Sequence, residues 1–448
     1  MHYSLLLCLL FTTAFARSSE GEPKPQNALA ETAAPSGRWI ITTDYLGTPL
    51  NFAMDLTQNG EKLTGNFEGD KLEGTLNGNS LHFLANDDQG GSEEATATVQ
   101  GNSMSGSLVF VYGSSPSHPF TVLFTAKLAA AHTATGTPKR HEFTPTVFYR
   151  QFSPHNQPVL TVAPGDTIHT TTVDAGGKDE KGMPRVLGGN PETGPFFVET
   201  AEPGDTIVVH LTRLRLNRDW ADSDDFVVER ALDSNLAVKM KDAGKDVRWH
   251  LDTAHGVATP DKPSDHLAHY SVPLKPMLGC IAVAPGLGSA APGTGDSGRW
   301  GGNMDFNEIV EGATVYLPVS VSGALLYVGD GHAVQGDGEL NGNALETSMD
   351  VEFTVDIIPG KKPMAPRVES RTHLMAMGLG GSLDDAFRLA TANMADWLMS
   401  DYKLTPSELA EVLGTGAEYK VSEVADRNVG MILKISKERL QLLTSAPK

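Results

Sequence analysis

The sequence is short of cysteine and of basic residues, and it has only one long apolar run. Cys8 and Cys280 are the two cysteines among 448 residues, which excludes a scaffold held by several disulfides. There are 35 Lys and Arg against 55 Asp and Glu, a net charge of −20. Such a surface repels a phosphate backbone, so we expect no nucleic-acid partner. Beyond the N-terminal run, no stretch reaches the roughly 18 to 20 consecutive apolar residues of a membrane-spanning helix, and no membrane span is expected.

The apolar run lies at the N-terminus and is typical of a secretory signal peptide. Leu5 to Phe15 is mostly apolar, and Ala14-Phe15-Ala16 fits the small-x-small pattern of a cleavage site, although no Lys or Arg precedes the run. We therefore expect residues 1–16 to be a signal peptide and the protein to be exported, to the periplasm or outside the cell. Residues 17–37 contain Ser and Pro without apolar periodicity, which predicts a flexible leader.

Short apolar strands separated by Asn-Gly turns predict a small antiparallel β domain over residues 38–130. Asn59-Gly60 and Asn77-Gly78 stand between such strands, and Asn-Gly supplies the positive φ angles of a two-residue hairpin turn. The expected fold is a small barrel or sandwich. Because it lacks clustered His, Cys or paired carboxylates, a structural or accessory role is favoured, although a closed barrel could hold a ligand. Residues 131–141 are small and polar and are interpreted as a linker.

Residues 142–448 form the second predicted domain, and the fold class of the chain is mainly β with α+β character. Pro164-Gly165-Asp166 and Pro203-Gly204-Asp205 each precede an alternating apolar strand, which favours a β-sandwich of jelly-roll type. The stretch 213–269 is rich in charge and has no clear period. We interpret it as a long insertion that forms part of a pocket wall.

The C-terminal region changes to helical spacing. Ser382 and Asp385 resemble a capping box ahead of apolar residues that predict a helix over 383–400. Thr405-Pro406-Ser407-Glu408 predicts the start of a second helix, which stops near Gly414. We expect the apolar face of these helices to pack against the sheet.

The densest group of polar functional residues is the segment 329–339, directly after a strand that reads as buried. Asp330 and His332 at i, i+2 point to one face of an extended segment, and Asp337 and Glu339 repeat the spacing. Three carboxylates and an imidazole brought together repel one another unless a cation or protons lie between them, so the segment predicts a divalent metal site. The alternative is a tight loop, because Asp-Gly pairs are also common turn formers.

Two other segments carry polar groups that could converge on this site. Thr172 and Asp174 share one face at the end of a strand, and in the segment 301–305 Asn303 could donate to a substrate carbonyl while Asp305 could orient a ligand. Cys280 lies in an apolar segment and is interpreted as a small buried side chain rather than a nucleophile. The sequence has no Ser-His-Asp elbow, Walker loop, CxxC pair or HExxH helix.

Taken in order, these segments resemble the acetamidase/formamidase family, the metal-containing amidases rather than the nitrilase-type formamidases that use a cysteine nucleophile. The resemblance covers roughly residues 143–440, and its most specific part is Gly-Asp-x-His-x-x-x-Gly-Asp-Gly-Glu at 329–339. The chain departs from the family pattern in its export signal, its first domain, its long insertion and its Gly298-Arg299-Trp300. The other matching segments are Pro158 to Val162, Thr172 with Asp174, Thr193 to Glu199, Glu202 to Asp205, Pro276 to Pro285, Gly301 to Asp305 and Tyr316 to Val319.

The resemblance implies a hydrolase that cleaves the C–N bond of a short linear carboxamide, of the formamide or acetamide type, through a metal-activated water. The implied metal ligands are Asp174, Asp330 and His332, with Glu199 as a further one. Either Asp337 or Glu339 would carry the proton from the attacking water to the leaving ammonia. The residues implied to hold the substrate are Asn303, Gln335 and Gly302.

The implied cofactor is a divalent metal ion, zinc in the first place, with calcium or manganese as alternatives. The partner is a small amide substrate, and the family resemblance favours a homo-oligomer. Two other functions stay open at this point. One is an exported binding protein that keeps the amidase scaffold without turnover, and the other is an amidase for a larger substrate that the insertion 213–269 admits.

Overall fold

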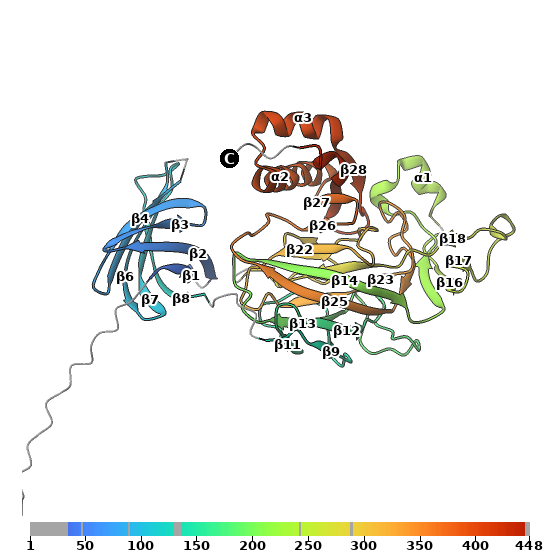
Figure 1. The fold of residues 1–448 in the computed structure, drawn as a ribbon. Coiled ribbons are helices and arrows are strands. Elements are labelled where there is room, and N and C mark those ends of the chain that lie inside the picture. Colours follow the sequence, from blue (N-terminus) through green and yellow to red (C-terminus); the bar gives the residue numbers. More distant parts are fainter. Residues whose placement is uncertain are drawn as a thin grey trace, which may run out of the picture.

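The computed structural model describes residues 35–45, 48–87, 90–129, 136–241, 243–286 and 290–443. The predicted signal peptide, nearly all of the predicted leader and residues 131–135 of the predicted linker lie outside these ranges. A β-barrel lies beside a larger β body that carries helices on one side (Figure 1). Among the described residues no helix is both long and apolar enough to cross a membrane.

The N-terminal domain is a closed antiparallel barrel, as predicted. Each strand pairs with the next, and the last strand returns to pair with the first. Gly60 and Gly78, at the two predicted hairpin turns, have φ of +64° and +59°, which is the left-handed conformation that Gly adopts without strain. The strands are β1 (Gly37–Tyr45), β2 (Thr48–Asn59), β3 (Lys62–Phe67), β4 (Asp70–Asn77), β5 (Ser80–Asn86), β6 (Ser92–Gln100), β7 (Ser103–Val111) and β8 (Phe120–Leu128).

Apolar side chains fill the barrel, because alternate residues of each strand point inward. In β5 and β8 the buried positions follow a strict period of two, as expected for strands with one face on a core. Trp39, Met54, Leu63, Leu72 and Phe83 are among the fully buried side chains of this core. The barrel interior is thus a packed apolar core.

The larger domain is built on two β-sheets that pack face to face. The first sheet contains β18 (Val272–Pro273), β17 (Val257–Pro260), β16 (Asp246–Asp252), β15 (Trp220–Asp224), β24 (Glu346–Thr347), β23 (Leu326–His332), β19 (Met277–Ala282), β21 (Gly301–Asn303) and β20 (Ser297–Gly298), with β13 (Glu192–Val198) on β23 and with β10 (Phe148–Tyr149) and β11 (Leu160–Val162) on β13. The second sheet contains β28 (Glu418–Val421), β29 (Val429–Ser436), β27 (His373–Gly380), β26 (Arg367–Glu369), β22 (Thr314–Pro318), β14 (Thr206–Leu216), β25 (Met349–Ile358), β12 (Thr167–Thr171) and β9 (Arg140–Glu142).

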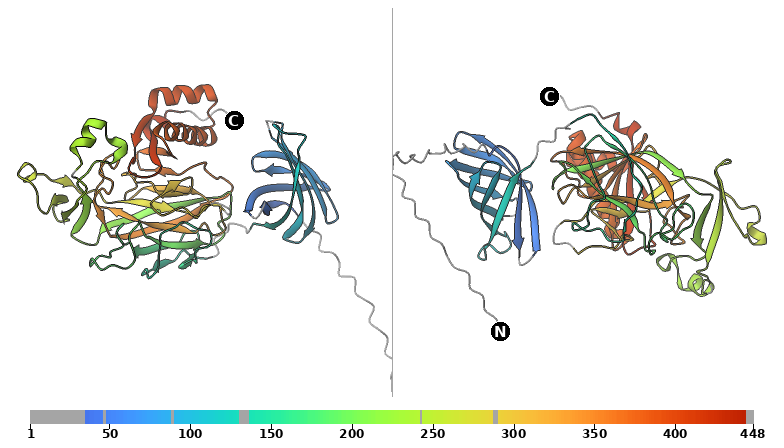
Figure 2. Two further views of the ribbon diagram at one scale, coloured as in Figure 1. Left: turned by 180° about the vertical axis from the view of Figure 1, so that it is seen from behind. Right: turned by 90° about the horizontal axis from the view of Figure 1, so that it is seen from below.

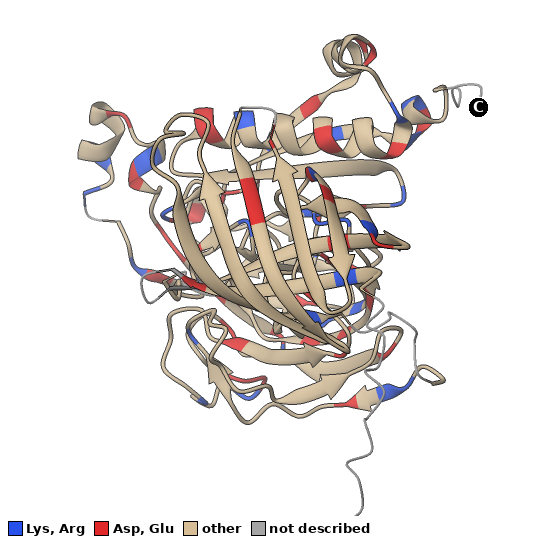
Figure 3. Cartoon of the chain, turned by 90° about the vertical axis from the view of Figure 1, so that its left-hand side faces the viewer, with Lys and Arg blue, Asp and Glu red and all other residues tan. Residues whose placement is uncertain are grey.

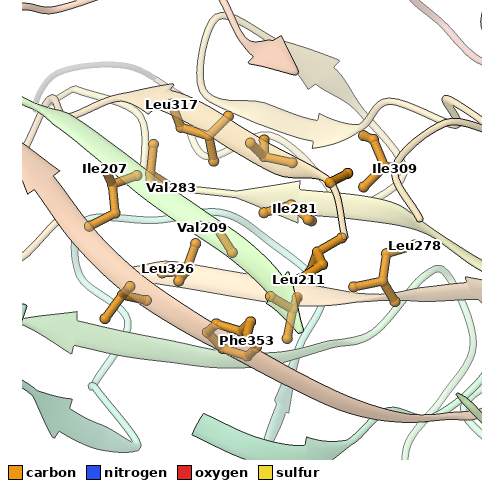
Figure 4. Packing of buried hydrophobic residues seen from close by; sticks show 14 of the residues in the cluster. Ile207, Val209, Leu211, Leu278, Ile281, Val283, Ile309, Leu317, Leu326 and Phe353 are labelled. Atoms are coloured by element: carbon orange, nitrogen blue, oxygen red, sulfur yellow. The ribbon is translucent and has the colours of Figure 1, made fainter. Parts of the chain in front are cut away.

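The core lies between these sheets and confirms the predicted sandwich. Ile207, Val209 and Leu211 of β14 face Ile281 of β19 and Leu326 of β23 (Figure 4), and all five side chains are buried in one cluster. The two Pro-Gly-Asp turns lead into β12 and β14 as expected. In each turn the Asp carboxylate accepts a hydrogen bond from a backbone N–H three residues earlier, which fixes the turn ahead of the strand.

The insertion 213–269 is more regular than its sequence pattern indicates. Its first residues continue β14, and the rest forms β15, β16 and β17, a 3₁₀ turn (Glu229–Ala231), a second 3₁₀ turn (Asp265–Leu267) and helix α1 (Ser234–Lys239). This part extends the first sheet away from the barrel (Figures 1 and 2). In β15 only Ala221 and Ser223 are buried, and in β16 only Leu251 is buried, so few apolar side chains mark these strands in the sequence.

The C-terminal helices agree with the caps read from the sequence. Helix α2 (Leu383–Tyr402) is capped by Ser382, and α3 (Pro406–Gly416) starts with a complete Thr405–Glu408 capping box. Met394 and Leu398 of α2 pack on β27 and β29, whereas Phe387 is half-exposed. A short helix α4 (Lys437–Leu440) follows β29.

The barrel and the larger domain meet at a few polar contacts. Arg38 of β1 donates to the Pro203 carbonyl over 3.4 Å and lies 3.7 Å from an Asp205 carboxylate oxygen. Seen from the barrel side, Lys and Arg are scattered among Asp and Glu rather than gathered into one patch (Figure 3).

Candidate functional site

The predicted pair Asp330 and His332 lies on one face of β23, in the middle of the first sheet. Glu346 of β24 is the cross-strand partner of His332, Asp305 follows β21, and Glu339 lies in the loop after β23. None of these five residues is more than 8% exposed. The sheet therefore brings four carboxylates and one imidazole into the interior.

Three carboxylates surround one nitrogen of His332. The Nε2 atom lies 3.4 Å from Asp330 Oδ1, 3.3 Å from Glu346 Oε1 and 3.8 Å from Asp305 Oδ1. Asp305, His332 and Glu339 form one group, and Asp330, His332 and Glu346 form another, in which the potential ligand atoms lie within 4.8 Å of one another. Both groups share His332, so its imidazole is the centre of the cluster.

Gln335 fixes which ring nitrogen of His332 carries hydrogen. Its Nε2 donates to the carbonyls of Asp305 and Ser422 over 2.5 and 3.1 Å, so its Oε1 faces His332 Nδ1 at 2.9 Å. Because an amide oxygen only accepts, Nδ1 must be the donor. The lone pair of a neutral imidazole would then point from Nε2 at the carboxylates, which is unfavourable unless a proton or a cation lies between them.

Burial is the largest cause of the raised pKa values of three acids in the cluster. Burial, with the neighbouring carboxylates, raises the pKa of Asp305 and of Glu339 well above the usual range and that of Glu346 to about 7. Burial would lower the pKa of His332, but Asp330 and Glu346 outweigh it and hold that pKa well above its usual value. These shifts favour the protonated form of the three acids unless a cation lies among them.

Several polar atoms of the cluster have no hydrogen-bond partner among the described residues. They are Asp305 Oδ1, Asp330 Oδ1, His332 Nε2 and Glu346 Oε2. Buried polar atoms are normally paired, because leaving one unpaired costs about 1–3 kcal/mol. A Cβ on Gly279 would lie 2.2 Å from Asp330 Oδ2 and 2.3 Å from Asp305 Oδ1, so only glycine lets both carboxylates come this close to the backbone. The unpaired atoms are what a site for a divalent cation requires.

The backbone is strained at four residues around the cluster. Asn190, Asp305, Asp330 and Glu339 have φ of +57°, +40°, +53° and +47°, in the left-handed region that residues other than glycine rarely occupy. Such a conformation costs of order 1–3 kcal/mol per residue and collects at functional sites. Here it turns the four side chains toward one another.

Three carboxylates of the cluster form the floor of a cleft of about 1170 Å³, and Asp305 and His332 lie behind them. Asp330, Glu339 and Glu346 line it together with two residues from elsewhere in the chain, Asn190 and Asp426. The insertion contributes the outer wall, as predicted. The wall residues from β15 and β16 are Asp222, Ser223, Asp224, Asp246 and Arg248.

Asn303 links the acids of the floor rather than facing open space. Its Nδ2 donates to Asp305 Oδ2 and to Asp426 Oδ2 over 2.6 Å each, and its Oδ1 accepts from Asn190 Nδ2 over 2.7 Å. Burial raises the pKa of Asp426 to about 6. The Asn190 Oδ1 atom has no partner within the described chain, so it is the acceptor of this network that is free to bind a ligand.

The loop that carries Asp426 is tied to the insertion. Arg230 donates from Nη1 to the Asp426 carbonyl over 2.8 Å and from Nη2 to the Arg427 carbonyl over 3.3 Å. Through this contact the insertion and the C-terminal unit together position an acid at the edge of the cleft.

Three carboxylates that were expected at the site from the sequence lie outside the cluster around His332. Asp174 lines the cleft, but its Oδ2 is 2.8 Å from Arg218 and its Oδ1 accepts the Lys178 N–H over 2.8 Å. Glu199 is exposed beyond the end of β13. Asp337 is exposed and pairs with Lys420 at 3.0 Å. The structure therefore does not bring these three carboxylates to the cluster.

Gly302 and Cys280 contribute to the sheet and its core and do not face the cleft. Gly302 has a φ of +98° and pairs with both neighbouring strands of the sheet, so it shapes β21 and lies behind the cleft. Cys280 is fully buried in β19, where burial raises the pKa of its thiol well above the usual value. It matches the small buried side chain expected from the sequence.

Five residues near the cluster were not identified as ligands or substrate contacts from the sequence. Glu346, Asp426 and Asn190 come from loops or short strands without a recognisable motif, and Asp305 had been assigned only an orienting role. Glu192, at the start of β13, is fully buried with both carboxylate oxygens unpaired among the described residues. Its burial, followed by the charge of Asp330, raises its pKa well above the usual value.

Comparison with known proteins identifies the family of the part of the chain that forms the cluster. The model of the Acetamidase/Formamidase family matches residues 287–376, the range that contains Asn303, Asp305, Asp330, His332, Glu339 and Glu346. The chain contains a domain of the acetamidase/formamidase family. The family predicted from the sequence is thereby confirmed.

Known relatives of this acetamidase/formamidase-family domain match it over different lengths. An acetamidase of Mycolicibacterium smegmatis is 43% identical over 61 residues, which are 13% of this chain and only 15% of that relative. The crystal structure of a predicted acetamidase/formamidase from Thermoanaerobacter tengcongensis is 27% identical with a TM-score of 0.58, covering 68% of this chain and 98% of that one. An acetamidase structure from Yersinia enterocolitica is 26% identical with a TM-score of 0.59, covering 68% and 94%.

Proposed function

We propose that the acetamidase/formamidase-family domain hydrolyses the C–N bond of a linear carboxamide with the help of a divalent metal ion. The observation that carries this proposal is His332 Nε2, which is buried behind carboxylates that line a cleft and has no hydrogen-bond partner within the described chain. The relatives named acetamidase or formamidase support the same reaction type.

The side chains of the cluster fit a divalent cation. Either group that contains His332 offers one imidazole nitrogen and two carboxylate oxygens, a donor set that suits zinc, manganese or calcium. When bound, such an ion supplies polarisation of the amide carbonyl and a water of lowered pKa. Of the four ligands expected from the sequence, Asp330 and His332 keep that role in the proposal, and Glu346 takes the place of Asp174 and Glu199.

Glu339 is the proton carrier in this proposal. Its carboxylate lines the cleft beside His332, whereas Asp337 lies outside. Glu339 takes one proton as the water oxygen bonds to the carbonyl carbon, and it returns that proton to the nitrogen as the C–N bond breaks. The products are then a carboxylic acid and ammonia. Burial raises the pKa of Glu339 above its usual range, which makes its carboxyl a better proton acceptor than an ordinary glutamate.

Amide side chains around the cluster hold the reacting groups in place. The unpaired Asn190 Oδ1 can accept a hydrogen bond from the substrate NH₂. Gln335 positions His332 by accepting from Nδ1, in the way that outer partners orient a metal-binding histidine. Both N–H groups of Asn303 are committed to carboxylates, so Asn303 acts on the acids rather than on the substrate.

Ammonia release with a matched pair of variants tests the proposal. Purified protein is assayed with formamide, acetamide and propionamide after metal loading and after chelation, and its metal content is measured. We expect release that depends on the metal. We also expect His332→Ala to lose bound metal and activity together, while Asp337→Asn, on the exposed side of the same loop, keeps both.

Two results would overturn the proposal. One is the absence of ammonia from every amide in the metal-loaded wild-type protein, which would favour an exported binding protein on an amidase scaffold. The other is native metal content and full activity in His332→Ala. Circular dichroism of each variant shows whether a loss reflects chemistry or unfolding.

A further inference from the structure

The cleft is much larger than acetamide. Acetamide has four heavy atoms and, at about 20–30 Å³ per atom, occupies on the order of 100 Å³, whereas the cleft measures about 1170 Å³. The residues of the cluster line only its floor. A substrate that fills the cleft therefore extends from the reacting amide toward the wall made by β15 and β16.

The carboxylates of that wall differ in whether a basic side chain neutralises them. Asp222 is paired with Arg248 at 2.5 Å and with Lys178 at 3.4 Å. Asp224 and Asp246 are cross-strand partners and line the same cleft. Within the described residues neither has an ion-pair partner, and Asp224 accepts a hydrogen bond from the Asn343 side-chain amide.

The other charged residues of the cleft do not neutralise Asp224 and Asp246. The basic residues that line the cleft are Arg150, Lys178 and Arg248. The last two pair with Asp222, and Arg150 donates to the Gly188 carbonyl over 3.0 Å. Burial, followed by the charge of Asp246, raises the pKa of Asp224 above its usual value, as expected for like charges that lack a counter-ion.

We propose that Asp224 and Asp246 bind a cationic group, a primary ammonium or a guanidinium, at the far end of the substrate. The preferred substrate is then a linear amide with a positively charged tail. This inference rests on the proposed amidase activity and adds the substrate class. An anionic tail would meet the acidic wall and be repelled, and a neutral tail would leave both carboxylates without a counter-ion.

Matched series of amides test the proposal. Ammonia release is measured for ω-amino amides from 3-aminopropanamide to 6-aminohexanamide, for the alkyl amides with CH₃ in place of NH₃⁺, and for the corresponding ω-carboxy amides. We expect kcat/KM to favour the best cationic amide about tenfold or more over its neutral match. The anionic amide should be the poorest of each trio.

Variants of the wall identify the residues responsible. In Asp224→Asn/Asp246→Asn the preference for the cationic amide should fall toward one, with wild-type metal content and melting temperature. Asp246→Asn alone changes an exposed side chain and should lower the preference partway. Asp261→Asn, which alters an exposed acid of the same insertion outside the cleft, should leave the preference unchanged.

The outcomes separate this inference from the function on which it rests. If wild-type protein hydrolyses amides but shows no preference for the cationic series, or if the double variant keeps that preference, the cationic subsite is wrong and the amidase stands. If no amide of any series releases ammonia from the metal-loaded protein, both proposals fall.

Discussion

The molecule has two buried interiors of opposite character. The barrel core contains tightly packed apolar side chains such as Trp39, Phe83 and Leu72, whose burial stabilises the fold. The floor of the cleft buries four carboxylates and an imidazole whose free atoms lack partners in the described chain, an arrangement that costs stability. The barrel interior therefore serves the stability of the fold, whereas in the proposed function a bound cation offsets the cost of the cleft interior.

The strongest test of the cleft interior is Glu339→Gln. The amide side chain keeps the size of Glu339 but cannot accept a proton, so kcat should fall by about 10²–10⁴-fold. Metal content should persist, because Asp330, His332 and Glu346 remain. Steady-state kinetics with metal analysis checks both. A variant that loses metal and activity together would instead make Glu339 a ligand, and one with full activity would leave the proton carrier unidentified.

The matching change in the barrel interior is Leu63→Ala. Leu63 is fully buried, so its truncation should destabilise the barrel by about 2–5 kcal/mol. The kcat of the folded protein should not change, because the cleft lies in the other domain. Chemical unfolding and ammonia release measure the two effects. A large loss of kcat would show that the two domains are coupled through contacts such as that of Arg38.

Glu93 of the barrel should give a smaller effect, on the pH dependence of barrel stability. Burial, followed by Asp70 and Asp87, raises the pKa of Glu93 from 4.5 to about 7. The folded barrel therefore binds this proton more tightly than the unfolded chain does. The stabilisation is complete below pH 4.5 and is lost as the pH rises through 7.

Glu93→Gln should flatten the pH dependence of barrel stability between pH 4.5 and 7. Glu61→Gln, which alters an exposed acid in the turn between β2 and β3, is the control that should keep it. Thermal melts across this range decide the question. An unchanged slope in Glu93→Gln would show that the titrating group lies elsewhere.

The sequence predicts features that depend on neighbours in the chain. The Asn-Gly turns, the caps at Ser382 and Thr405, and the shared face of Asp330 and His332 all follow from spacings of a few residues, and the structure contains each of them. Local spacing is sufficient there because turns, caps and strand alternation act over short distances.

Pairings between distant elements could not be predicted in this way. Glu346 reaches His332 only because β24 pairs with β23, and Arg218, within the insertion, takes up the carboxylate of Asp174. Glu192 and Glu199 lie at opposite ends of β13, and the motif alone does not show which end meets the cluster. The family resemblance implies Glu199 as a ligand, whereas the structure buries Glu192 and leaves Glu199 exposed.

The left-handed backbone at Asn190, Asp305, Asp330 and Glu339 has a consequence for protein engineering. Glycine would relieve the strain at each of the four positions, yet it would delete the side chain on which the cleft depends. Selection for heat tolerance alone should therefore accumulate glycines there and yield a sturdier but inert variant. A thermostable form that still works must gain its stability elsewhere, and the barrel can be improved without disturbing the chemistry.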